Sequence, residues 1–374
     1  MSSIANSRET AFFARLNAMT DQWMDLFGYL APSVVTTTAE EYRACRETAA
    51  LMDFSMLRKV DIEGPGAAEF MNGIVARDLS RVPIGRIAYG ALTDEHGKMI
   101  DDCTCMIRSP DAVRFCGAND RDYVLFSDRA AGTGIKVSEM TEALPHLCLQ
   151  GPASRRILQG LTDADISGEA FPYYMFREDV EIAGIPVFMT RLGYTAELGF
   201  ELWVERARCL DLWEALIEAG TPAGMQVIGM DALDLFRIEG GFIIGGVEYD
   251  PSVSPYECGL GWSVDLAKNN LPAREALLHD RDATRLRLSS VVLESGGADA
   301  TGATLESGGN EIGFITQAVV SPHLNGATLG LAKIDRGSAE AGTPVQARVG
   351  DAVVAGEVVR QPVYDPERRR AKES

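Results

Sequence analysis

Two adjacent aspartates, Asp101 and Asp102, lie in the stretch KMIDDCTCMI, whose apolar pattern predicts a β-strand. Neighbouring residues of a strand point to opposite faces of the sheet, so one of the two carboxylates must face inward. Asp101 shares its face with apolar side chains, namely Met99, Cys103, Cys105 and Ile107. A buried carboxylate is costly unless it is paired or hydrogen-bonded. Asp101 is therefore predicted either to take part in chemistry or to hold a loop by a structural hydrogen bond.

A second carboxylate, Glu201, lies in RLGYTAELGFELWVER, which spans residues 191–206. The second half of this stretch alternates like a strand and places Glu201 on the same face as Trp203. The first half is a polar, aromatic kink between Gly193 and Gly199. The pattern has two interpretations, a solvated edge strand with a bulge at Gly199 or a strand that presents Glu201 to a ligand.

One arginine occupies an unusual position in the predicted helix GMDALDLFRIEGG. Arg237 follows Met230 by seven residues and so lies on the apolar stripe of the helix, where it either extends to solvent or binds a ligand. A pocket with Glu201 and Arg237, and with Trp262 or Tyr364 as an aromatic face, would suit a flat heteroaromatic ring. Such a ring offers amidine-like donors to a carboxylate.

The elements expected around these residues alternate between helix and antiparallel strand. Thr38 and Glu41 form a predicted capping box at the start of a helix. GGFIIGG lacks the spacing of a phosphate-binding loop and is interpreted as a helix stop followed by a tight strand. From about residue 284 short strands separated by glycine-rich turns predict a small β-barrel or sandwich. The other expected elements are helices over about 39–52, 67–75 and 206–220, and strands over 58–64, 85–94, 98–109 and 112–118.

The chain of 374 residues has 35 Lys and Arg against 54 Asp and Glu, a net charge of −19. This charge disfavours binding to nucleic acid or to an anionic membrane and favours a cationic substrate. An anionic ligand would require individual arginines set against the overall field. No apolar run reaches the length of a membrane span, and the first twenty residues lack the pattern of a signal peptide. We therefore expect a cytoplasmic protein.

The seven cysteines are scattered and form no CxxC pair, so we expect reduced, packed thiols. The four histidines, too, lack the spacing of metal ligands, and we predict no metal site. No dinucleotide-binding or phosphate-loop motif is present, so nucleotide cofactors are not indicated.

Eight motifs occur in the order seen in the glycine cleavage system T-protein family, which includes tetrahydrofolate-dependent aminomethyltransferases and demethylases. The chain resembles this family over roughly residues 27–366. The motifs are LMDFS near residue 53, MIDD, LQGPAS, RLGYTAELGFEL, MDALDLFRIEGG, SPYECGLGW, SPHLN and PVYDP.

The resemblance implies an α+β fold: a three-domain cloverleaf of antiparallel sheets with helices around a central folate site. Residues 1–280 would form the folate-binding, aminomethyltransferase-like region of two α+β subdomains. Residues 281–366 would form a C-terminal β-barrel-like domain, and residues 367–374 a frayed tail. The implied cofactor is tetrahydrofolate.

The matching positions also imply roles for individual residues. Asp101 matches the family's catalytic carboxylate, and Glu201 matches a residue that binds the pterin ring. Tyr29, in FGYLAP, lies near the family's substrate entrance, although a packed surface tyrosine is an equal alternative. The remaining implied folate contacts are Arg237, Tyr364, Trp262 and Tyr194.

The chain departs from the T-protein pattern at three positions: Ala196 and Leu198 replace a glycine and an aspartate, and Met56 stands in place of a histidine. PYECGL and SPHLN are closer to the dimethylsulfoniopropionate demethylase branch, although that branch tends to carry another residue where Asp101 stands. No FAD-binding half precedes the folate region, so we expect no oxidation of the substrate.

We therefore expect transfer of a methyl group from a small methylated onium, amine or ether donor to tetrahydrofolate. Two alternatives remain: aminomethyl transfer from a carrier protein, as in glycine cleavage, and a folate-binding regulator without turnover.

Overall fold

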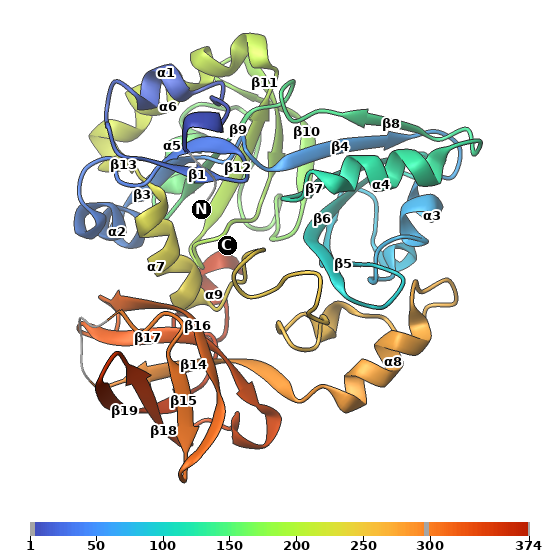
Figure 1. Ribbon diagram of the computed structural model, residues 1–374. Helices are drawn as coiled ribbons and strands as arrows, with labels where there is room; N and C mark the ends of the chain where they lie inside the picture. The colour runs from blue at the N-terminus through green and yellow to red at the C-terminus, as the bar shows by residue number, and fades with distance from the viewer. Residues whose placement is uncertain (1–3, 295–298, 373–374) are drawn as a thin grey trace.

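The computed structural model describes residues 4–294 and 299–372, which form three lobes around a common centre (Figure 1). Each lobe is built on its own sheet: one of six strands, one of five, and a closed six-stranded barrel. The expected cloverleaf of α+β lobes with a C-terminal barrel is confirmed. Within the described ranges, no helix has both the length and the apolarity that crossing a membrane requires.

The first lobe is a sheet in the order β10-β11-β12-β9-β3-β13, antiparallel except where β13 pairs with β3. One face packs on helices through a core that includes Leu149, Phe200 and Trp213. A short hairpin and a four-residue helix precede the sheet. The bounds in this part of the chain are α1 Phe13–Leu16, β1 Trp23–Leu26, β2 Tyr29–Pro32, α2 Thr38–Glu47, β3 Ala49–Asp53, β9 His146–Gln150, α5 Ser154–Gln159, β10 Phe176–Ile182, β11 Ile185–Thr190, β12 Gly199–Val204, α6 Cys209–Gly220, β13 Met225–Val227 and α7 Met230–Gly240.

The second lobe is an antiparallel sheet in the order β5-β6-β7-β4-β8, covered by α3 and α4. The predicted hairpin and third strand are confirmed as β5, β6 and β7. A small core that includes Met106 and Trp203 joins this sheet to the first. The bounds are β4 Arg58–Glu63, α3 Ala67–Asn72, β5 Ile87–Thr93, β6 Met99–Ser109, β7 Ala112–Gly117, α4 Arg121–Ala130 and β8 Lys136–Glu139.

The third lobe is a barrel in the order β14-β17-β16-β15-β18-β19, closed by the pairing of β14 with β19. Helix α8 runs between the second lobe and the barrel (Figure 1). The bounds are α8 Arg274–Ala283, β14 Leu286–Leu293, β15 Thr304–Ser307, β16 Asn310–Ser321, β17 Ala327–Asp335, β18 Pro344–Val349, β19 Ala352–Val359 and α9 Arg369–Lys372.

Three local predictions were wrong. The helix predicted over 39–52 ends at Glu47, because its last residues join the first sheet as β3, and its cap is Thr37 with Glu40 rather than Thr38 with Glu41. Residues 240–246 end α7 but form no strand, only an isolated bridge at Gly245. Residues 369–372 of the predicted frayed tail form α9, and Arg370 contacts Glu197, while residues 373 and 374 lie outside the described ranges.

Candidate active site

A cavity of about 180 Å³ lies between the first and second lobes. Two carboxylates line it from opposite sides, Asp102 on β6 and Glu201 on β12. Aromatic rings, including Tyr89, Tyr174 and Tyr194, form much of the remaining wall. We call this space the inner chamber. Its composition, mostly apolar with a few polar groups, is typical of a site for a small organic ligand.

A second cavity of about 590 Å³, the outer chamber, adjoins the inner one. Five residues line both chambers and form a waist between them. The waist residues are Tyr89, Tyr173, Tyr174, Phe242 and Ile243.

Three arginines line the outer chamber: Arg77 after α3, Arg287 on β14, and Arg368 just before α9. No acidic residue is among the lining residues. Between described residues, none of the three takes part in an ion pair within 4 Å. This chamber is therefore locally basic within a chain of net charge −19 and suits an anionic group.

Glu201 is fixed by its neighbours at the wall of the inner chamber. Its Oε2 accepts hydrogen bonds from the Thr190 hydroxyl at 2.9 Å and from the Trp203 indole N–H at 3.4 Å. Burial raises the pKa of this carboxyl, and these two donors and Lys59 oppose the rise. The tryptophan beside the carboxylate therefore holds it in place. β12 lies inside the sheet between β11 and β9 and is buried on both faces, so the interpretation as a solvated edge strand was wrong.

The two glycines of the kink make room for one side chain, Gln150. A Cβ atom would lie 1.8 Å from Gln150 Oε1 at Gly193 and 2.1 Å from it at Gly199. Gln150 in turn accepts from the Thr195 hydroxyl and donates to the carbonyl of residue 192. Gly193 and Tyr194 line the inner chamber, and the Tyr194 hydroxyl donates to the carbonyl of Ile243.

Asp102, rather than Asp101, lies on the wall of the inner chamber. Asp101 is only 2% exposed, as the alternation predicted, and its carboxylate accepts from the backbone N–H groups of Ala118 and Asn119 at 2.6 and 3.0 Å. Asp102 is partly buried and accepts from the Tyr89 hydroxyl at 2.7 Å. Burial, and then the neighbouring Asp101, raise the pKa of Asp102 to about 6.

Arg237 is 1% exposed and lies outside both chambers. It pairs with Asp234 at 2.6 Å and Glu248 at 3.1 Å and contacts Gln317 of the barrel. The side chain neither extends to solvent nor points into a chamber. In this structure it joins α7 to the barrel.

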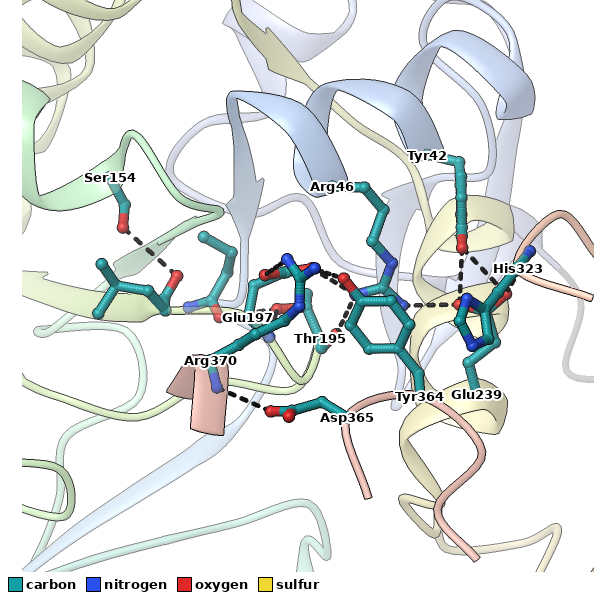
Figure 2. A network of polar contacts seen from close by, with 12 residues as sticks. Tyr42, Arg46, Ser154, Thr195, Glu197, Glu239, His323, Tyr364, Asp365 and Arg370 are labelled. Atoms are coloured by element: carbon teal, nitrogen blue, oxygen red, sulfur yellow. Dashed lines mark hydrogen bonds and ion pairs between the residues drawn. The ribbon is translucent and has the colours of Figure 1, made fainter. Parts of the chain in front are cut away.

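Tyr364 also lies away from both chambers, in a buried polar network (Figure 2). Its hydroxyl donates to Glu197, and its ring lies under the guanidinium of Arg46, 3.6 Å from the ring centroid. Arg46 pairs with Glu197 and with Glu239 on α7. The network ties the end of the chain to the first lobe.

The last two predicted site residues lie in other cavities. Trp262 is 62% exposed and lines the outer chamber, where Arg77 lies over its ring at 5.3 Å. Tyr29 is buried, donates to Glu142 at 2.7 Å, and lines a separate polar cavity of about 220 Å³. Of the seven predicted site residues, the inner chamber therefore brings together Glu201 and Tyr194, and the outer chamber contains Trp262.

One group of candidate metal ligands occurs in residues 4–294 and 299–372. His146, Cys148 and Glu201 lie on adjacent strands, with one ligand atom of each within 4.8 Å of the others. Sequence spacing did not reveal this group because Glu201 comes from a different strand. The buried ammonium of Lys59 acts electrostatically on all three residues and disfavours a divalent cation there. That the chain binds no metal stays a prediction.

Asp102 and the three arginines of the outer chamber were not singled out from the sequence. Period-2 alternation put Asp102 on the less buried face of β6, and that face borders the cavity. The net charge gave a reason to look for individual arginines. However, Arg77, Arg287 and Arg368 are distant in the chain and meet only where the three lobes converge.

Comparison with known proteins identifies the family. The GCVT N-terminal domain matches residues 12–268, and the glycine cleavage T-protein C-terminal barrel domain matches residues 287–365. The structure of aminomethyltransferase T from Bartonella henselae matches with a TM-score of 0.86 at 22% identity, covering 97% of this chain and 99% of that one, and so shows the same fold.

Two curated relatives align over nearly the whole chain. A trimethylamine-oxide aldolase of Ruegeria pomeroyi is 30% identical over 384 residues, which cover 98% of this chain and 48% of that protein, so this chain spans about half its length. An aminomethyltransferase of Alkaliphilus metalliredigens is 30% identical over 364 residues, covering 96% and 98%. The resemblance expected from the motifs is confirmed: the chain belongs to the glycine cleavage T-protein family, whose members are enzymes that use tetrahydrofolate.

Proposed function

We propose that this protein transfers a methyl group from a small methylated donor to tetrahydrofolate. The observation that carries the proposal is the pair of adjoining chambers, one lined by two carboxylates and the other by three arginines. A reduced folate has the matching polarity, with a ring rich in N–H donors at one end and glutamate carboxylates at the other. When bound, tetrahydrofolate supplies the nitrogen that accepts the one-carbon unit.

Each chamber would bind a different part of the folate. Glu201, already oriented by Thr190 and Trp203, would accept hydrogen bonds from the donor edge of the pterin ring. Arg77, Arg287 and Arg368 would bind the glutamate carboxylates. The aromatic waist between the chambers suits the benzoyl group that links the two ends of the folate.

The donor would occupy the apolar end of the inner chamber. Phe27, Phe54 and Met56 form this end together with Leu26 and Leu57. Aromatic faces bind methylated cations by cation–π contact, and the net charge of −19 favours a cationic donor. The relative named trimethylamine-oxide aldolase supports a methylated nitrogen compound as the class of donor.

Asp102 would act as the proton acceptor. Methylation of a secondary amine releases a proton, and Asp102 is the carboxylate that β6 presents to the chamber. With a pKa of about 6, this group is ionised at neutral pH and is close to the range in which general bases work best. The mostly apolar lining of the chamber would also keep water away from the reacting groups.

A second candidate is aminomethyl transfer from a carrier protein. Several relatives named aminomethyltransferase favour it. Against it stand Ala196, Leu198 and the apolar Met56, at positions where the T-protein pattern carries a glycine, an aspartate and a histidine. A regulator without turnover would bind folate and form no product.

Titration calorimetry with tetrahydrofolate tests the site assignment. We expect Glu201→Gln to weaken binding by about 2 kcal/mol, because buried ring donors lose their charged acceptor. Arg287→Gln should weaken binding of a triglutamate form more than that of the monoglutamate. The matched control is Arg285→Gln, two residues away and paired with Asp335 on the surface, which should leave affinity unchanged. Unchanged affinity in both Glu201→Gln and Arg287→Gln would remove the assignment.

A further inference from the structure

A buried network lies directly behind Asp102. The hydroxyl oxygen of Tyr249 is 2.6 Å from Asp102 Oδ1 and 2.8 Å from Asp101 Oδ1. The same oxygen accepts a hydrogen bond from the backbone N–H of Asp102 at 3.0 Å. Tyr249 is itself buried and comes from the loop after α7. One hydroxyl therefore bridges a carboxylate on the chamber wall and a carboxylate in the interior.

This geometry constrains where the protons can be. A tyrosine hydroxyl has one proton, so it can donate to only one of the two carboxylates at a time. The other short contact is favourable only when that carboxyl carries a proton and donates to the tyrosine oxygen. The arrangement therefore accommodates one proton more than the hydroxyl itself provides.

The surroundings favour the retention of such a proton. No Lys, Arg or His among the described residues forms an ion pair with Asp101, Asp102 or Asp122. Asp122, on α4, is fully buried, and its carboxyl lies against that of Asp101, to which it donates a hydrogen bond when protonated. One oxygen of Asp101 and one of Asp122 lie 2.4 and 2.8 Å from the point where a Cβ atom would stand at Gly117.

The remaining groups that face the network are neutral donors. The Tyr89 hydroxyl donates to Asp102, and the backbone N–H groups of Asp102, Ala118 and Asn119 donate to Asp101. Burial raises the pKa of Asp101. The pKa of Asp122 is raised to about 10 by burial and by the nearby charge of Asp101. Asp122 is therefore neutral at physiological pH, and the exchangeable charge is confined to Asp101 and Asp102.

We propose that Asp102, Tyr249 and Asp101 form a proton relay that removes the proton produced in the chamber and restores the charge of Asp102. The relay rests on the proposed function, since it handles the proton released by one-carbon transfer. In the first step an O–H bond forms at Asp102. Asp102 then gives this proton to the tyrosine oxygen while the hydroxyl gives its own proton to Asp101 Oδ1. Asp102 is again a carboxylate and Asp101 holds the proton. After product leaves, the proton returns through Tyr249 to Asp102 and passes from there to water that enters the chamber.

In this scheme Asp102 is the catalytic residue, and Tyr249 and Asp101 act through it as positioning and proton-holding residues. The scheme explains why the interior carries a second carboxylate on the same strand. A single isolated Asp102 would stay protonated after each transfer until the proton reached solvent.

Tyr249→Phe tests the relay, because it removes the bridging oxygen and keeps the ring. We expect unchanged affinity for tetrahydrofolate, a turnover number lowered about tenfold or more, and a proton inventory in mixed light and heavy water that changes from curved to linear. Tyr256→Phe is the matched control: it removes a buried tyrosine hydroxyl that has no hydrogen-bond partner among the described residues and lines neither chamber, and it should leave turnover within about twofold. Wild-type turnover and a curved inventory in Tyr249→Phe would overturn the relay.

A measurement on the ligand-free protein separates failure of the relay from failure of the proposed function. The infrared carbonyl band of buried protonated carboxyls should titrate as the coupled Asp101 and Asp102 pair, above a constant contribution from neutral Asp122. Tyr249→Phe should shift the midpoint of this titration by about one pH unit or more. A melting temperature close to that of the wild type would confirm that the variant folds. An identical midpoint with and without the Tyr249 hydroxyl would contradict the relay, whatever the donor or the folate product is found to be.

Discussion

Asp101 and Asp102 are adjacent in the sequence and share the hydroxyl of Tyr249, but they differ in their other contacts. Asp101 accepts hydrogen bonds from the backbone N–H groups of Ala118 and Asn119 and so stabilises the segment after β7. Asp102 faces the inner chamber and is held by the hydroxyls of Tyr89 and Tyr249. The residue that meets a ligand is thus the partly buried one, because the open side of β6 borders a cavity rather than bulk water.

Asparagine substitutions should separate the two roles. Asp102→Asn removes the proton acceptor, so turnover should fall about a hundredfold or more with near-normal folate affinity. Turnover of the wild-type enzyme should rise with pH through about 6 and then level off, because only ionised Asp102 accepts a proton. Steady-state kinetics from pH 5 to about 8 and folate titrations provide the measurement.

Asp101→Asn should affect both the stability of the fold and turnover. It puts an amide beside two backbone donors and so should lower the free energy of unfolding by about 1–3 kcal/mol, measured by denaturant titration. It also breaks the relay, so turnover should fall less than in Asp102→Asn. Full activity in Asp102→Asn, together with loss of activity in a stable Asp101→Asn, would return the catalytic role to Asp101.

The sequence was sufficient to identify several site residues and insufficient to place others. Glu201 and Tyr194 could be predicted because a motif of unusual composition contains both. Arg237 and Tyr364 matched motifs equally well, yet lie in ion-pair and hydrogen-bond networks. An arginine with buried carboxylate partners and an arginine that binds a ligand have the same sequence pattern, and only the partners distinguish them.

At the scale of elements, the loop before β12 sets the shape of the inner chamber. The side chain of Gln150, from the neighbouring strand β9, fills the space that Gly193 and Gly199 leave open. The loop is therefore packed against the sheet while Gly193 and Tyr194 remain on the chamber wall. The backbone of this loop has to pack against Gln150 of the neighbouring strand before Glu201 can face a ligand.

Gly193→Ala should disturb this fit, because its Cβ would overlap Gln150 Oε1 at 1.8 Å. We expect a loss of about 1–3 kcal/mol in the free energy of unfolding and weaker folate binding. Because Gln150→Ala removes the overlapping atoms, the double variant should be more stable than additivity of the two single variants allows. Additive effects in a thermal-denaturation cycle would show that the glycine does not serve to accommodate Gln150.

Element types were predictable from the sequence wherever one periodicity ran without interruption, as in β5, β6 and β7. The end of α2 was not, because residues 49–52 are equally apolar in a helix or a strand, and pairing of β3 with β9 decides the outcome. The C-terminal tail is charged and was predicted to be frayed, yet Arg370 forms an ion pair with Glu197, which is distant in the sequence. Such partners are distant in sequence and leave no local signal.

At the scale of the whole molecule, the chambers exist only because three lobes are held together. The network in Figure 2 is one of the joints: Arg46 on α2 connects Glu197, Glu239 and Tyr364, and Ser321 of the barrel also donates to Glu239. The joint is buried and highly charged. Its charges are therefore sensitive to the loss of any one partner.

Arg46→Met should lower the free energy of unfolding by about 3–5 kcal/mol, because it leaves buried Glu239 without its cation and leaves Glu197 only the partly exposed Arg370. The matched control is Arg15→Met, whose exposed pair with Glu214 should contribute less than about 1 kcal/mol. Denaturant titration of both variants measures the difference. Equal stabilities would mean that the lobes are held mainly by apolar contacts and that the network contributes little.

The central claim concerns the whole assembled site: a methyl group passes from a small donor to tetrahydrofolate. Incubation of the protein with tetrahydrofolate and a panel of methylated amines, N-oxides, onium compounds and ethers, followed by mass measurement of the folate, tests it most directly. The account predicts 5-methyltetrahydrofolate and the demethylated donor, with the product lost in Asp102→Asn. Methylenetetrahydrofolate and ammonia, formed only with an aminomethylated carrier protein, would contradict it.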